Sequence, residues 1–120
     1  MLPISASSAV YLAYVTGAFL ALLGIVFAIS PARGLAMTKH QAENLPTIMA
    51  GRYFFMVLVS VGVALTGTLQ QIAFVFMGLA GVAFFDAATY ARAKTPVMPH
   101  ILAGVGALIV ALIALQGQTS

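Results

Sequence analysis

The chain has 120 residues, of which 62% are hydrophobic and only 6% are charged, with a formal net charge of +3. A soluble domain carries about 25% charged residues, so this composition excludes an ordinary soluble protein. The small basic excess forms no stripe and does not favour binding to nucleic acid. The chain has no cysteine, which excludes disulfides and thiolate metal sites.

The first apolar stretch predicts a transmembrane helix over about 8–29, because a span takes about 20 apolar residues. The dipeptide Ser30-Pro31 ends it. The segment before it lacks the basic region of a secretory signal, so we interpret the stretch as a retained helix.

A connection over 30–45 follows, and it mixes apolar with basic side chains. A short interfacial helix and a plain surface loop are both compatible with that pattern. The second helix is predicted over about 46–67, with a proline tolerated in its first turn. Arg52 and Met56 lie one turn apart on its smaller, more polar face, which we expect to look into a helix bundle.

The third helix is predicted over about 69–91, after a short turn, and the fourth over about 99–115. Two prolines in the connection over 92–98 and at its end oppose a regular helix there. Small residues at spacing four predict a close-packing face on the fourth helix: Ala103, Ala107 and Ala111.

The five basic and two acidic residues all lie in or beside the connections 30–45 and 92–98. In an antiparallel bundle of four transmembrane helices, these two connections fall on one face. Basic loops favour the cytoplasmic side. The sequence therefore predicts one transmembrane domain over 1–120 in the bacterial inner membrane, with both termini in the periplasm.

Asp86 is the most informative residue, because a carboxylate inside a membrane helix is costly and normally has a partner. It lies about five residues, or roughly 7 Å, inside the third helix. Arg52 enters the second helix to a similar depth from the same face, so we expect an ion pair. The pair could be a structural clamp that fixes helix register, or a site for binding or proton handling. Either side chain could instead extend to lipid headgroups.

His100 begins the fourth helix at a similar depth, and could donate a hydrogen bond to Asp86 or remain a neutral interfacial histidine. Tyr90 lies one turn from Asp86 and Tyr53 adjoins Arg52. Both tyrosines could extend the polar cluster, although interfacial aromatics are common. His40, in the first connection, is not expected to be a ligand.

The residue inventory argues against several classes of membrane protein. The two histidines are too few for a multi-histidine metal enzyme, and no phosphate-binding, nucleophile-elbow or HExxH motif occurs. We expect no metal and no cofactor. The length and helix count are similar to those of small multidrug-resistance transporters, but their glutamate in the first helix is missing.

Three stretches carry a family resemblance: AGRYFFMVLVSVGVAL, AGVAFFDAATYARAK and PHILAGVGALIVAL. The run from Ala50 to Leu115 resembles a family of small bacterial four-helix membrane proteins of unknown function. Members often show an arginine opening helix 2, a late Asp in helix 3 and a His opening helix 4. The general architecture is similar to that of DoxX-like proteins. The resemblance points to Arg52, Asp86 and His100 but implies no activity.

The leading hypothesis is a non-catalytic membrane protein that binds a membrane lipid or hydrophobic small molecule, or serves as an accessory subunit of a complex. Its binding residues would be Arg52, Tyr53, Asp86, Tyr90 and His100. A protein partner or a homo-oligomer is possible in this hypothesis. One alternative is a small membrane enzyme in which Asp86 and His100 act as acid and base. Another is a proton-coupled transporter, for which Ser60 and Thr66 are the only deeper polar candidates.

Overall fold

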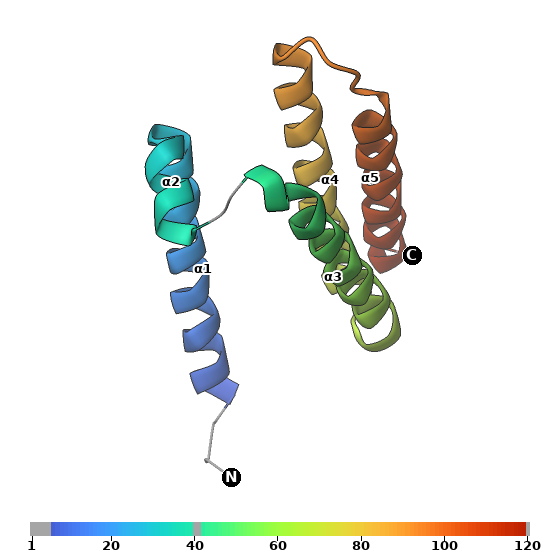
Figure 1. Ribbon diagram of the computed structural model, residues 1–120. Coiled ribbons are helices and arrows are strands. Elements are labelled where there is room, and N and C mark those ends of the chain that lie inside the picture. The colour runs from blue at the N-terminus through green and yellow to red at the C-terminus, as the bar shows by residue number, and fades with distance from the viewer. Residues whose placement is uncertain (1–5, 40–41, 120) are drawn as a thin grey trace. The chain divides into compact units, whose positions relative to one another are not determined.

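A computed structural model describes residues 6–39 and 42–119, and that part of the chain is helical, without strands (Figure 1). His40 lies outside the described residues. The elements in chain order are α1 (Ala6–Ile29), α2 (Pro31–Thr38), the short 3-10 helix η1 (Ala42–Asn44), α3 (Leu45–Thr66), α4 (Leu69–Arg92) and α5 (Met98–Thr119).

Four helices, α1, α3, α4 and α5, are long and apolar enough to cross a membrane, which confirms the predicted number. Their large apolar side chains are mostly exposed; Phe54, Leu65 and Phe74 are 75%, 80% and 81% exposed. An apolar outer surface of this extent suits contact with lipid. Helix α5 continues to Thr119, beyond the end expected near Leu115.

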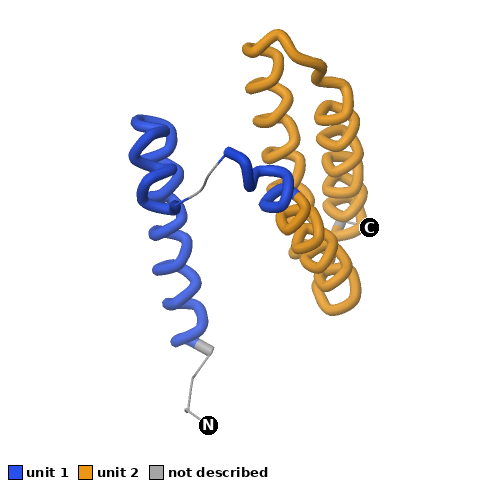
Figure 2. Tube along the Cα trace, in the orientation of Figure 1, with its two compact units in different colours: residues 1–49 blue, residues 50–120 orange. Residues whose placement is uncertain are grey.

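The described chain divides into two compact units, residues 1–49 and 50–120 (Figure 2). Helix α3 begins in the last residues of the first unit and continues into the second. Each unit is described by itself below. A single transmembrane domain over the whole chain remains a prediction.

In the first unit, the described part of the connection after α1 is mostly helical, formed by α2 and η1. Pro31 occupies the first turn of α2, where its missing N–H costs no hydrogen bond. The ring of Phe27 lies directly against Gly34, at a distance that leaves no room for a Cβ atom. Thr38 then donates to the carbonyl of Gly34, 2.8 Å away, and Lys39 ends the helix in a left-handed conformation.

In the second unit, α4 and α5 pack closely through small side chains. Ala73, Ala80 and Ala87 are buried at intervals of seven residues along α4, so they share one face of the helix. On α5 the buried residues are Gly104, Ala111 and Ala114. Because these buried residues are glycine and alanine, the two backbones approach closely, as in many membrane helix pairs.

The packing face of α5 differs from the predicted one. Ala111 is fully buried, as expected, but Ala103 is exposed and Ala107 only partly buried. Gly104 lies against α4 instead, and a Cβ there would come within 2.7 Å of the Phe84 ring. The reason is rotation of the helix: the face that meets α4 is centred on Gly104 and Ala111, seven residues apart, rather than on a spacing of four.

Hydrogen bonds at both ends of α4 hold the chain segments that precede and follow this helix. Thr68 and Gln71 form a capping box, in which each side chain bonds the other residue's backbone N–H. At the other end, Thr95 bonds the carbonyl of Tyr90 through both its N–H and its hydroxyl. The chain then returns over residues 93–97 and enters α5, so α4 and α5 lie side by side (Figure 1).

Helix α3 approaches its neighbours differently. Its backbone stays farther from α4 and α5 than those two are from each other. It is joined to α4 by the turn at Gly67-Thr68 at one end and by a side-chain ion pair near the other. Between these attachments, side chains of α3, α4 and α5 line a cleft.

Candidate functional site

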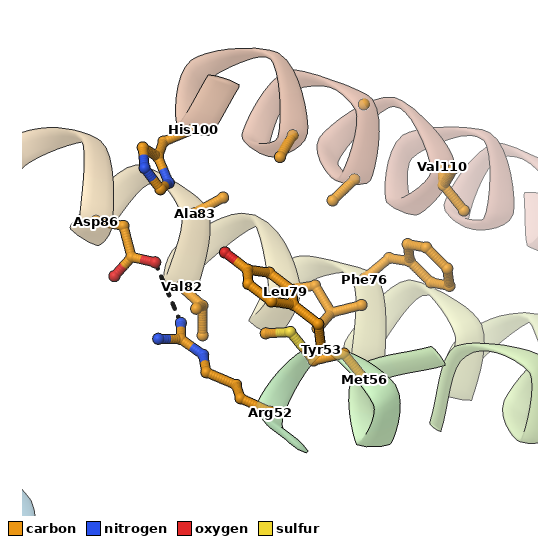
Figure 3. A pocket seen from close by; sticks show the side chains of 13 residues that line it. Arg52, Tyr53, Met56, Phe76, Leu79, Val82, Ala83, Asp86, His100 and Val110 are labelled. Atoms are coloured by element: carbon orange, nitrogen blue, oxygen red, sulfur yellow. Dashed lines mark hydrogen bonds and ion pairs between the residues drawn. The ribbon is translucent and has the colours of Figure 1, made fainter. Parts of the chain in front are cut away.

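The ion pair expected between Arg52 and Asp86 is present. Nη2 of Arg52 donates to Oδ2 of Asp86 over 3.2 Å (Figure 3). The Arg52 side chain is 34% exposed and that of Asp86 is 22% exposed. The two charges come from helices separated by a single tight turn, which is why the sequence could predict their meeting.

The contact is a single hydrogen bond rather than a bidentate fork. A guanidinium has five N–H donors and a carboxylate has two oxygens. Among the described residues, the side chains of Arg52 and Asp86 form no other hydrogen bond. Most of the donor capacity of Arg52 and one oxygen of Asp86 therefore remain available to a bound molecule.

Of the two possibilities that the sequence left open for His100, the hydrogen bond to Asp86 is not formed in the part of the chain that the structure describes. The His100 ring stacks on Tyr90, with centroids 4.8 Å apart and planes inclined by 25°. Thr95 bonds the carbonyl of Tyr90, and the connection over 93–97 then leads into α5, whose third residue is His100. Tyr90 therefore supports His100 from the side and does not line the cleft.

A cleft of about 290 Å³ opens between α3, α4 and α5 and contains the predicted residues at one end. Its lining residues are Arg52, Tyr53, Met56, Phe76, Leu79, Val82, Ala83, Asp86, His100, Ala103, Gly106, Ala107 and Val110. The structure thus brings four of the five predicted site residues to one cavity. All of these lie within the second unit.

The polar groups of the cleft gather at its mouth. Figure 3 shows Arg52 and Asp86 joined at one end, His100 beside them on α5, and Tyr53 pointing from α3 into the cleft. Among the described residues, the Tyr53 hydroxyl has no hydrogen-bond partner. Beyond this mouth the lining is aliphatic or aromatic, apart from the sulfur of Met56.

The apolar depth of the cleft was not predicted from the sequence. Phe76 and Val110 lie at the end away from the ion pair (Figure 3). The helical period does indicate which residues share a face with Asp86. These are Leu79, Val82 and Ala83, which lie seven, four and three residues before it. What the period could not show was that α3 stands far enough away to leave this face uncovered.

The two deeper polar candidates lie elsewhere. Ser60 and Thr66 do not line the cleft, and the hydroxyl of Thr66 donates to the carbonyl of Gly62 in its own helix. Within the described ranges, no group of three metal-ligating side chains occurs. The site therefore consists of an apolar cleft with a polar mouth, an arrangement suited to holding an amphipathic molecule.

No protein-family model, curated protein or solved structure shows significant similarity to this chain.

Proposed function

We propose that the protein is a multi-pass membrane protein that binds an amphipathic molecule in the cleft of α3, α4 and α5. The polar part of the ligand lies against Arg52, Tyr53, Asp86 and His100, and its apolar part extends toward Phe76. The observation that carries this proposal is the cleft itself. An ion pair that served only to fix helix register would need no cavity beside it.

In this proposal the four apolar helices cross the bacterial inner membrane as an antiparallel bundle. Both connections that carry the basic residues face the cytoplasm, because loop Lys and Arg favour that side. The mouth of the cleft then opens near the cytoplasmic surface. Both termini lie in the periplasm.

The same geometry bears on the other hypotheses. A membrane enzyme would need Asp86 and His100 in one cavity, and both line this cleft. Acid–base catalysis with this pair remains an alternative, although no hydrogen bond joins them among the described residues. A proton-coupled transporter gains no support from Ser60 or Thr66. An accessory subunit could present the bound molecule to a protein partner.

Native mass spectrometry of protein released from membrane nanodiscs tests the proposal. We expect wild type to retain an additional mass, and Ala107→Phe to lose it because the ring fills the cleft. Leu112→Phe is the matched control, since Leu112 is 53% exposed on the same helix and does not line the cleft. Equal retention by both variants would contradict the proposal.

The orientation has a separate test. A reporter that is active only in the periplasm, fused after Ser120, should be active, and a cytoplasmic reporter at the same position should be silent. The opposite result would place the charged connections outside and would reverse the proposed topology.

A further inference from the structure

We infer that the ligand is an uncharged, single-chain amphiphile with a hydroxyl-bearing headgroup and an apolar tail of about ten to twelve carbons. This inference rests on the proposed binding function and specifies its ligand. It is drawn from the charge balance of the mouth and from the length of the cleft.

The mouth carries no net charge when His100 is neutral, because the charge of Asp86 offsets that of Arg52. Among the residues that the structure describes, no other charged side chain lines the cleft. An anionic headgroup would be attracted by Arg52 but repelled by a carboxylate 3.2 Å away from that guanidinium. A cationic headgroup would be attracted by Asp86 but repelled by Arg52. The mouth therefore favours a neutral headgroup over either ion.

The hydrogen-bonding groups of the mouth are of both kinds. Arg52 offers N–H donors only, and the second oxygen of Asp86 offers an acceptor. The hydroxyl of Tyr53 can do both. A headgroup that pairs a carbonyl with hydroxyls satisfies them together: the carbonyl accepts from Arg52 or Tyr53, and a hydroxyl donates to Asp86. A simple hydrocarbon would pair with none of these groups, and an ether could accept from Arg52 or Tyr53 but would have no hydrogen to donate to Asp86.

The length of the cleft limits the tail. Phe76 lies ten residues from Asp86 on α4, and Val110 lies ten residues from His100 on α5. At 1.5 Å per residue, both helices give a depth of roughly 15 Å. An extended chain advances about 1.25 Å per carbon, given ordinary C–C bonds. About twelve carbons span that depth, and fewer are needed where the headgroup occupies the mouth.

Length selection should come from fit rather than from hydrophobicity. A tail that leaves the bilayer for the cleft moves between two apolar surroundings, so added methylenes gain little by transfer. A short tail leaves a void at Phe76, which forfeits dispersion contacts. A long tail must bend or extend past the end of the cleft.

The test uses 1-monoacylglycerols with 6, 8, 10, 12, 14 and 16 carbons, added to nanodisc-embedded protein and detected by native mass spectrometry. Fatty acids of the same lengths provide the charged headgroup. We expect retention to peak at 10–12 carbons, about tenfold above 16 carbons, in the lower range of what misfit methylenes cost in an apolar pocket. The neutral series should exceed the fatty acids at pH 7.

Gly106→Leu is the diagnostic variant. Gly106 lines the cleft six residues from His100, and a Cβ atom there would meet nothing within 4 Å. The leucine side chain should shorten the cleft to a depth of roughly 9 Å. The tail length of maximal retention should then move to 6–8 carbons. Gly78→Leu is the matched control. Its position is equally open but does not line the cleft, so its peak should stay at 10–12 carbons.

The possible results separate this inference from the proposed function. Retention that ignores tail length, or a peak unmoved by Gly106→Leu, would overturn the length assignment while leaving a binding cleft. Stronger retention of the fatty acids would overturn the neutral headgroup. If no probe binds but wild type keeps a native mass that Ala107→Phe loses, only the ligand class is wrong. If neither occurs, both proposals fail.

Discussion

Helix α4 has two neighbours in the second unit and meets them in opposite ways. Toward α5 it presents Ala73, Ala80 and Ala87, which are buried, and the backbones of the two helices approach each other closely. Toward α3 it presents Phe76, Leu79 and Val82, which line a cleft. Within one helix, side-chain size decides which face forms a dry contact and which remains open.

The contrast has a physical basis in the proposed membrane location of the helices. Helices in lipid gain no hydrophobic free energy by packing together, so close association depends on dispersion and on how nearly the backbones can approach. Methyl-sized residues permit that approach on the α5 side. On the α3 side the residues are larger and the backbones lie farther apart, and the ion pair and the turn at Gly67-Thr68 connect the helices instead.

The most direct test of this difference is to make the same substitution on the buried face and on the cleft face of α5. Ala111 is 0% exposed, and Ala107, one turn earlier, lines the cleft. We expect Ala111→Leu to destabilise the protein by about 1–3 kcal/mol through overpacking. Ala107→Leu should leave the thermal unfolding midpoint, followed by circular dichroism in detergent, almost unchanged. Equal losses would show that the cleft is packed by protein in solution.

The second prediction concerns the ion pair that joins α3 to α4. Asp86→Asn leaves the guanidinium of Arg52 without its carboxylate, and we expect a loss of about 1–2 kcal/mol, since both groups are partly exposed. The double variant Arg52→Gln/Asp86→Asn should recover much of that loss. A double-mutant cycle on unfolding free energies measures the coupling. Strictly additive effects would mean that the pair does not hold α3 in place.

Part of this arrangement could be predicted from the sequence. The four apolar helices follow from hydropathy and length, and the ion pair of Arg52 with Asp86 follows from the short turn that joins their two helices. Both rest on local information. For His100 the sequence left a hydrogen bond to Asp86 and a neutral interfacial position both open, and in the described structure the imidazole stacks on Tyr90 without that hydrogen bond.

The cleft could not be predicted for a different reason. Its existence depends on the distance between α3 and its neighbours, which results from all the side chains along both helices together. The packing face of α5 shows the same limit. A spacing of four predicted Ala103, Ala107 and Ala111, of which only Ala111 is buried, and Gly104 takes part in the contact instead of Ala103 and Ala107. A rotation of a helix by a fraction of a turn moves residues from contact to cleft.

A third prediction concerns the turn at Gly67-Thr68, which joins α3 to α4 at the end away from the ion pair. Thr68→Ala removes one half of the capping box that begins α4, and we expect it to cost about 1 kcal/mol. Thr66→Ala is the control, because its hydroxyl bonds only within its own helix turn, and it should cost nearly nothing. Similar unfolding midpoints for the two variants would indicate that the cap does not stabilise the turn between α3 and α4.

The smallest predicted effect distinguishes two roles of His100: stabilising the fold by stacking on Tyr90, and contacting the bound ligand. Stacking of its ring on Tyr90 should contribute about 0.5–1 kcal/mol. His100→Ala removes the ring and should lower stability by that amount, whereas His100→Phe keeps a stacking ring and should not. If the imidazole also contacts the bound headgroup, both variants will retain less of the native mass than wild type. Normal retention by the phenylalanine variant would instead assign His100 to the wall of the cleft, and would leave recognition to Arg52, Tyr53 and Asp86.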